Sequence, residues 1–233
     1  MDDATAHPWV RTFRARRGRT TPAQRAWLDD ALGRRGLPDG PLDPSTLFGR
    51  QAPLVLEIGS GLGHAALGYA GAFPDHDLIA VDVHTPGIAL LLSRADAAGL
   101  GNVRAAEGDA LDVLDRLPSG SLHAVHVFFP DPWPKRPHRK RRILRPDVLD
   151  VLADRLEPGG TLRAATDDAA YAREARLLLA SHAAFVPLPA DRPPWRPGLG
   201  FEARALAAGR DVHELVARRL WAERTGLPGR SQG

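Results

Sequence analysis

The chain has 233 residues, of which 43% are hydrophobic and 25% are charged, as is ordinary for a globular protein with one well-buried domain. No apolar run approaches the roughly 20 residues that span a bilayer. The acidic N-terminus, Met1 to His7, lacks the apolar segment of a signal peptide, so we expect a cytoplasmic protein without a membrane partner. Cysteine is absent, which excludes disulfides, thiolate metal sites and a cysteine nucleophile.

The net charge is only +3, but the cations are clustered. One cluster lies near the N-terminus and comprises Arg11, Arg14, Arg16, Arg17 and Arg19. A second cluster comprises Lys135, Arg136, Arg139, Lys140, Arg141 and Arg142. Such clusters on a nearly neutral chain indicate a local footprint for a polyanion, although solvated arginines explain the N-terminal cluster about as well. The nine histidines give no convincing set of ligands, so no metal is expected.

Residues 1–20 are basic and irregular. A helix is expected to begin after Thr21, because threonine suits the N-cap and Pro22 suits the first helical position. It should end between Gly33 and Gly36. Residues 37–52 are rich in proline and glycine and indicate a connector.

From residue 54 onward strands and helices alternate, which is typical of a parallel sheet with crossover helices. Strands are expected at residues 54–58, 78–83, 103–106, 123–129, 161–165, 184–188 and 211–220. Helices are expected at residues 64–72, 86–98, 110–117, 141–156 and 168–182. The pattern predicts an α/β fold with a mostly parallel seven-stranded sheet and helices on both faces.

A glycine-rich turn, Gly59-Ser60-Gly61-Leu62-Gly63, follows the first of these strands, which carries Glu57 at its end. Glycines allow a tight turn and let a ligand approach the backbone closely. A dinucleotide fingerprint has the wider spacing G-x-G-x-x-G, and an acid beside a pyrophosphate would repel it. The motif therefore favours a cationic, phosphate-free ligand such as S-adenosyl-L-methionine.

Two further acids follow the next two strands. Asp82 ends the second strand about 20 residues after the turn, where a carboxylate accepts hydrogen bonds from both ribose hydroxyls. Asp109 follows the third strand and either accepts from an adenine amino group or caps the helix at Ala110. Open α/β sheets bind ligands at the carboxyl ends of their strands. We therefore expect a cofactor site made of Glu57, Gly59, Gly61, Gly63, Asp82 and Asp109.

The fourth strand runs into a stiff acidic and aromatic loop, Pro130-Asp131-Pro132-Trp133-Pro134-Lys135. Each proline fixes φ and biases the preceding residue toward an extended conformation. A stiff loop loses little entropy when it holds a ligand, so Asp131 and Trp133 are presented in a preset geometry. The carboxylate and the ring would position a base, and the neighbouring cations would bind the polyanion that carries this base. A proline-rich turn before a solvated basic helix is the alternative.

These residues resemble the bacterial tRNA (guanine-N7-)-methyltransferase family. The most specific piece runs from Phe128 to Lys135 and continues through 138–142, and a second piece is Ala165-Thr166-Asp167. The resemblance implies a Rossmann-like class I methyltransferase fold, with residues 1–50 as a basic N-terminal extension and residues 51–233 as the methyltransferase domain. It implies S-adenosyl-L-methionine-dependent methylation of N7 of guanine at position 46 of tRNA, with the protein a monomer or a homodimer.

The resemblance also implies roles for individual residues. Asp131 has a catalytic or cofactor-proximal role, and the cofactor contacts include Glu57, Asp82 and Asp109. Substrate contacts are expected at Lys135, Asp167, Phe201, Glu202, Arg139 and Lys140, of which the cations would hold tRNA phosphates.

The likeness is incomplete toward the C-terminus. Where the family has Thr-Lys-Phe-Glu, this chain has Leu199-Gly200-Phe201-Glu202, so a hydroxyl and an ammonium are missing. Where the family has Gly-His-Gly-Val-Trp-Asp, this chain has Gly-Arg-Asp-Val-His-Glu at residues 209–214. This difference leaves two alternatives, an altered affinity for the base or the tRNA and an altered choice of substrate.

Guanine N7 carries a lone pair and no proton, so methyl transfer to it requires in-line alignment and no strong base. Asp131 would stabilise the charge that arrives on the base, or accept from the guanine N1–H and amino group. The alternatives are a methyltransferase of another RNA or of a small molecule, and a catalytically inactive RNA-binding protein on the same scaffold. A nicotinamide-dependent oxidoreductase ranks third because of the glycine spacing.

Overall fold

The computed structural model describes residues 10, 12 and 21–221, so the whole N-terminal basic cluster lies outside the described residues. The described chain forms a seven-stranded sheet with the strand order β3-β2-β1-β4-β5-β7-β6. Its strands are β1 (Leu54–Ile58), β2 (Asp77–Asp82), β3 (Val103–Glu107), β4 (Leu122–Phe128), β5 (Leu156–Thr166), β6 (Phe185–Leu188) and β7 (His213–Arg219). The first five strands pair in parallel, and β7 runs antiparallel to both of its neighbours. The predicted mostly parallel seven-stranded sheet is confirmed.

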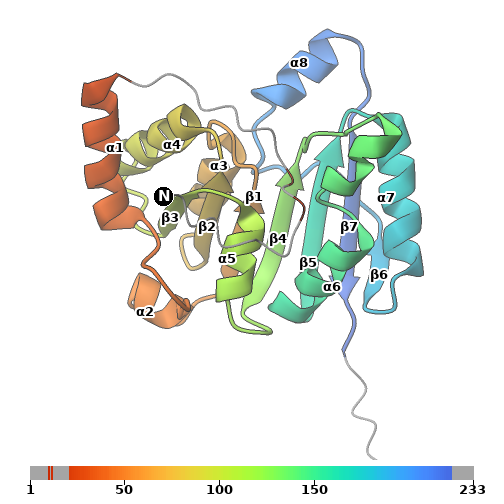
Figure 1. The fold of residues 1–233 in the computed structure, drawn as a ribbon, viewed down its shortest axis with the longest axis horizontal. Helices are drawn as coiled ribbons and strands as arrows, with labels where there is room; N and C mark the ends of the chain where they lie inside the picture. The colour runs from red at the N-terminus through yellow and green to blue at the C-terminus, as the bar shows by residue number, and fades with distance from the viewer. Residues whose placement is uncertain (1–9, 11, 13–20, 222–233) are drawn as a thin grey trace, which may run out of the picture.

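Helices cover both faces of the sheet, as predicted, and each face has its own apolar core (Figure 1). One core packs α5 (Ala110–Arg116), α6 (Pro146–Arg155) and α7 (Ala169–Ser181) against the sheet. The other packs α1 (Pro22–Arg35), α3 (His64–Ala72) and α4 (Thr85–Ala97). Successive residues of β1 alternate between the two cores, because side chains of a strand point to opposite faces. No helix in the described part of the chain has the length and apolar character needed to cross a membrane.

The helix predicted after Thr21 is confirmed as α1. The Thr21 side chain accepts a hydrogen bond from the backbone N–H of Gln24 at 3.2 Å, and the Gln24 side chain accepts from the Thr21 N–H at 2.9 Å. This reciprocal capping box satisfies two N–H groups that the helix itself leaves free. The helix then packs against α4 and β3, where its Leu28 is fully buried.

Two predicted boundaries between residues 141 and 165 are wrong. The helix predicted from residue 141 begins only at Pro146, because proline takes the first helical position and holds Arg145 extended. Residues before it form a short 3-10 helix, η1 (Arg136–Arg141). The strand predicted at 161–165 is longer, since β5 already begins at Leu156 and runs through the glycines at 159 and 160.

Two short helices were not predicted. Within the connector, α2 (Pro44–Phe48) is capped by Asp43, whose carboxylate accepts from the Ser45 N–H at 3.1 Å. Near the C-terminus, α8 (Phe201–Ala207) stands beyond the edge of the sheet at which β4 and β5 end (Figure 1). Each helix has seven residues or fewer, so its apolar pattern is too short to recognise from sequence.

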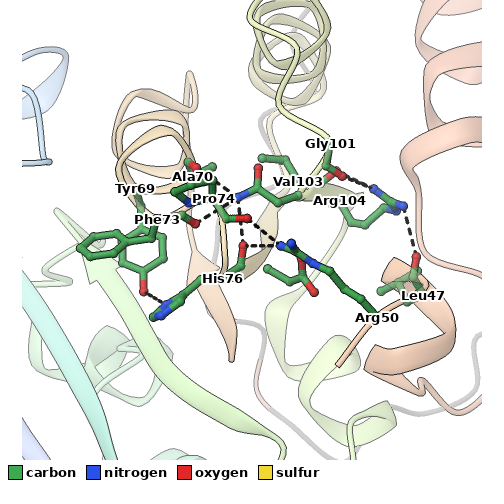
Figure 2. Close-up of polar contacts among 12 residues, drawn as sticks. Leu47, Arg50, Tyr69, Ala70, Phe73, Pro74, His76, Gly101, Val103 and Arg104 are labelled. Atoms are coloured by element: carbon green, nitrogen blue, oxygen red, sulfur yellow. Dashed lines mark hydrogen bonds and ion pairs between the residues drawn. The ribbon is translucent and has the colours of Figure 1, made fainter. Parts of the chain in front are cut away.

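At the other end of the strands, where β2 and β3 begin, hydrogen bonds to backbone carbonyls hold the loops in place (Figure 2). The buried Asn102 amide donates to the carbonyls of Ala70 at 3.1 Å, Phe73 at 3.3 Å and His76 at 2.9 Å. Ala70 and Phe73 lie at the end of α3, where carbonyls lack helical partners, and His76 directly precedes β2. Further bonds of the same kind are made by Arg50 to Pro74 and His76, and by Arg104 to Gly101 and Leu47. These bonds therefore fix the entry into β2 and β3.

The Asn102 contacts predict a stability effect without a functional effect. We expect Asn102→Ala to lower the free energy of unfolding by about 1–3 kcal/mol, because the Ala70 carbonyl loses its side-chain donor, while those of Phe73 and His76 keep other donors. Urea denaturation measures this. Ser181→Ala is the matched control, since it removes an exposed side-chain bond to a carbonyl and should change stability by about 0.5 kcal/mol or less. Equal small effects in the two variants would show that the Asn102 contacts do not hold these loops.

Candidate active site

The glycine turn after β1 is held in shape by the end of β2. Gly59, Gly61 and Gly63 have φ of +77°, +56° and +77°, where residues with a side chain are strained. The Gly61 N–H donates to Asp82 Oδ2 at 2.6 Å, and the His84 N–H donates to Asp82 Oδ1 at 2.8 Å. Asp82 therefore ties the turn to the neighbouring strand, and its carboxylate faces the same edge as the turn.

Asp109 caps α5, which is one of its two predicted roles. Its Oδ1 accepts from the Leu111 N–H at 3.1 Å and from the Thr12 hydroxyl at 3.4 Å. The cap also fixes the carboxylate at the edge of the sheet where Asp82 lies, so capping and ligand binding are compatible.

Glu57 is the most unusual charged group of the site. Its side chain is 2% exposed, and its Oε2 has no hydrogen-bond partner among the described residues. The pKa of this carboxyl is raised to about 8, chiefly by burial and also by the negative charge of Asp82, although the Ala66 N–H and the Arg196 guanidinium lower it. A buried carboxylate with an unpaired oxygen is costly, and a cationic ligand offsets that cost. The observation fits an ammonium group.

A cavity of about 620 Å³ lies at this edge of the sheet, within the size range of small-molecule sites. The predicted site residues in its wall are Glu57, Gly59, Gly61, Asp82, Asp109, Asp131, Phe201 and Glu202. Residues far apart in the sequence thus meet, because the carboxyl ends of parallel strands share one edge.

The other predicted site residues lie outside the cavity wall. Gly63 is the N-cap of α3, and Asp167 follows β5 and pairs with Arg210, whose Nε lies 2.8 Å from Asp167 Oδ2. The cations Lys135, Arg139 and Lys140 lie in or next to η1. Asp167 and these cations are therefore not part of the cavity wall.

The loop that carries Asp131 is strained. Phe129 and Trp133, on either side of Asp131, have φ of +52° and +42° although neither is glycine. Such residues cost roughly 1–3 kcal/mol each and persist only where their surroundings hold them. The Phe129 N–H donates to the Ala165 carbonyl at 2.7 Å, and the buried Trp133 donates from Nε1 to the Thr12 carbonyl at 3.3 Å. The loop thus presents Asp131 to the cavity in one geometry.

The six cations after this loop differ in environment. Arg142 is buried, with its guanidinium 4.8 Å from the centre of the Tyr171 ring, and its Nε donates to the Pro132 carbonyl at 2.7 Å. Arg139 pairs with Glu174 at 3.0 Å. Arg142 therefore supports the loop, while the side chains of Lys135, Arg136, Arg139 and Lys140 are exposed.

Sequence reasoning missed two parts of the cavity wall, Thr12 and the segment around Arg196. The Arg196 side chain is 2% exposed and pairs with Glu202 at 3.0 Å and with Glu214. Its surroundings in the sequence, Pro-Pro-Trp-Arg-Pro, signal only a stiff segment. Among the residues that the structure describes, no group of three or more His, Cys, Asp or Glu side chains is arranged to hold a metal ion.

Comparison with known sequences identifies close relatives. A family model described as a putative methyltransferase matches residues 51–215. The tRNA (guanine-N(7)-)-methyltransferase of Nitrosomonas eutropha is 40% identical over 91% of this chain and 97% of its own length. The protein of the same name from Halorhodospira halophila is 45% identical over 90% of this chain and 94% of its own length.

Comparison with solved structures supports the fold alone. An rRNA methylase from Streptococcus thermophilus aligns with a TM-score of 0.50 and 14% identity, over 73% of this chain and 88% of its own. The [4+2]-cyclase SpnF aligns with a TM-score of 0.51 and 18% identity, over 93% of this chain and 89% of its own. The described architecture is thus the Rossmann-like fold of class I methyltransferases.

The raised pKa of Glu57 predicts how stability depends on pH. The folded protein keeps a proton on this carboxyl up to about pH 8, whereas the unfolded chain releases it near 4.5, the ordinary pKa of a glutamic acid. Stability is therefore lost as the pH rises from about 4.5 to 8. We expect Glu57→Gln, measured without ligand by urea denaturation, to match the wild type near pH 5 and to exceed it by roughly 3–5 kcal/mol near pH 8.5.

The control for this prediction is Asp39→Asn, which makes the same chemical change at an exposed carboxylate. It should leave the stability unchanged at both pH values. A Glu57→Gln effect of the same size at pH 5 and pH 8.5 would contradict the assignment.

Proposed function

The chain belongs to the tRNA (guanine-N7-)-methyltransferase family, and we propose that it transfers a methyl group from S-adenosyl-L-methionine to N7 of guanine 46 of tRNA in the cytoplasm. One observation carries the proposal. The unpaired carboxylate of Glu57 and the fixed carboxylate of Asp131 line the same cavity.

The cofactor side of this cavity is acidic. Glu57 would take the ammonium group, Asp82 the ribose hydroxyls and Asp109 the adenine amino group. The glycines at 59 and 61 leave the backbone open to close approach. When bound, the cofactor supplies an activated methyl group.

The acceptor side is formed around Asp131. N7 of guanine already presents a lone pair, so the chain has to align the base and accommodate the positive charge that it gains. Asp131 would stabilise that charge, or accept from the N1–H and amino group of the base. Phe201, with 60% of its surface exposed at the cavity wall, offers an aromatic face to a base.

The RNA side is formed by the exposed cations. Lys135 and Lys140 would contact phosphates, with Arg139 held by Glu174 close by. Asp167 would contact the substrate from the end of β5, where it pairs with Arg210.

The catalytic role of Asp131 is tested with labelled cofactor and unmodified tRNA. We expect Asp131→Ala to lower the rate of 7-methylguanosine formation by about 100-fold or more, because the charge on the base is no longer stabilised. Cofactor affinity, measured calorimetrically, should change by less than about threefold, since Glu57 and Asp82 remain.

Asp39→Asn, at an exposed site in the connector, serves as the control and should retain full activity. A fully active Asp131→Ala variant would remove this residue from the reaction. Cofactor binding by the wild type without 7-methylguanosine would favour another RNA or a small molecule as acceptor, and absence of cofactor binding would favour an inactive RNA-binding protein.

The exposed cations predict the salt dependence of tRNA binding. Each phosphate contact releases counterions, so Lys135→Ala combined with Lys140→Ala should weaken binding and reduce the slope of log affinity against log salt by about 1.5. Filter binding over a series of salt concentrations measures this slope. Arg34→Ala, an exposed cation that pairs with Asp30 in the last turn of α1, should leave it unchanged. A flat wild-type salt dependence would contradict phosphate binding.

A further inference from the structure

Arg196 lies in a segment that crosses the carboxyl edge of the sheet between β6 and α8, which we call the strap (residues 192–200). The strap passes close over α3, where a Cβ on Gly68 would lie 2.3 Å from the carbonyl oxygen of Trp195. The Arg196 side chain is 2% exposed and forms part of the cavity wall. A fully charged group is thus placed inside the protein, directly at the site.

The guanidinium of Arg196 binds two carboxylates from different elements. Its Nε donates to Glu202 Oε2 at 3.0 Å, which ties it to α8. Its Nη1 donates to Glu214 Oε2 at 3.1 Å, which ties it to β7. A planar fork with five N–H donors can bind two carboxylates at once, whereas an ammonium group cannot match this geometry.

The flat face of the same guanidinium covers the end of β4. It lies 4.7 Å from the centre of the Phe128 ring and 5.8 Å from that of Phe129, the strained residue two positions before Asp131. The neighbouring Trp195 stacks on His126 of β4, with ring centres 5.0 Å apart and planes at 22°. The strap is therefore fastened to the strand from which the Asp131 loop starts.

We propose that Arg196 is a positioning residue that joins the wall formed by α8 to the loop carrying Asp131. It thereby sets the spacing between the two sides of the cavity that receive the methyl acceptor. The inference rests on the proposed function and deepens it. Glu202, for which the family resemblance implies a substrate contact, then acts on the substrate through Arg196 and α8, since its carboxylate is buried at 2% exposure and bound to Arg192 and Arg196.

Stability alone does not explain such a cluster. Removing charges from water costs about as much as their mutual attraction returns, and apolar residues of similar volume often serve stability equally well. A buried guanidinium group additionally fixes the geometry between the groups that it binds. At a site where reacting groups must be aligned, an error of about 1 Å can cost 100-fold in rate.

The test is a triple variant, R196M/E202Q/E214Q, which removes the three charges together so that no buried charge is left unpaired. Amide hydrogen exchange, measured without tRNA, should rise by about tenfold or more both in residues 128–135 and in residues 201–207, while β1 to β3 are unchanged. The single-turnover rate at saturating tRNA and cofactor should fall by about tenfold or more. Exchange that rises only in 201–207, or a rate within threefold of the wild type, overturns the proposal.

Two single variants sharpen the result. R196K keeps the positive charge but replaces the planar guanidinium by an ammonium group, so it should show the same loss of rate. Full activity in R196K overturns the role of the guanidinium geometry. R192M is the control within the strap, because Arg192 binds Glu202 and donates to the Arg196 carbonyl but is 43% exposed and does not bind Glu214 among the described contacts. It should raise exchange only in residues 201–207.

The exchange experiment is independent of the reaction. If the wild type forms no 7-methylguanosine, the proposed function fails, while the exchange pattern of the triple variant still decides whether Arg196 joins the two segments.

Discussion

The site depends on a carboxylate that is buried at the end of a central strand. Glu57 lies between β2 and β4, with one oxygen unpaired among the described residues and a pKa raised to about 8. Such a group lowers stability, and the two apolar cores on either side of the sheet offset that cost. A protein retains a destabilising buried acid of this kind where a ligand needs it, and the amino group of the proposed cofactor has the charge that would favour its ionised form.

The two sides of the cavity use different means to hold their groups. On the side proposed for the cofactor, backbone N–H groups bind Asp82 and a helix cap holds Asp109, so ordinary turn and cap chemistry suffices. On the acceptor side, two strained residues frame Asp131, and surrounding contacts hold them. A guanidinium that touches Phe129 on one face and two acids on its edge links this strained loop to the opposite wall. The spacing of the site is thus a tertiary property.

Local patterns in the sequence were sufficient for the sheet and for the acids and glycines that line the cavity. A mostly parallel sheet follows from alternating strands and helices, and acids at strand ends meet because the carboxyl ends of parallel strands lie together. The role of Arg196 was not predictable, since its partners at 202 and 214 become neighbours only after α8 and β7 fold back. The start of α6 was missed because the apolar pattern outweighed Pro146, and the positive φ of Phe129 and Trp133 has no signature in residue type. The division at residue 50 and the roles of individual site residues stay predictions.

The central claim, methylation of N7 of guanine 46, is tested most directly with two unmodified tRNA transcripts that differ only at position 46. Each is incubated with the wild-type protein and S-adenosyl-L-methionine, digested to nucleosides and analysed by mass spectrometry. The account predicts 7-methylguanosine from the transcript with guanine 46 and none from the transcript with adenine 46. Equal amounts from both transcripts, or a different methylated nucleoside, would contradict it.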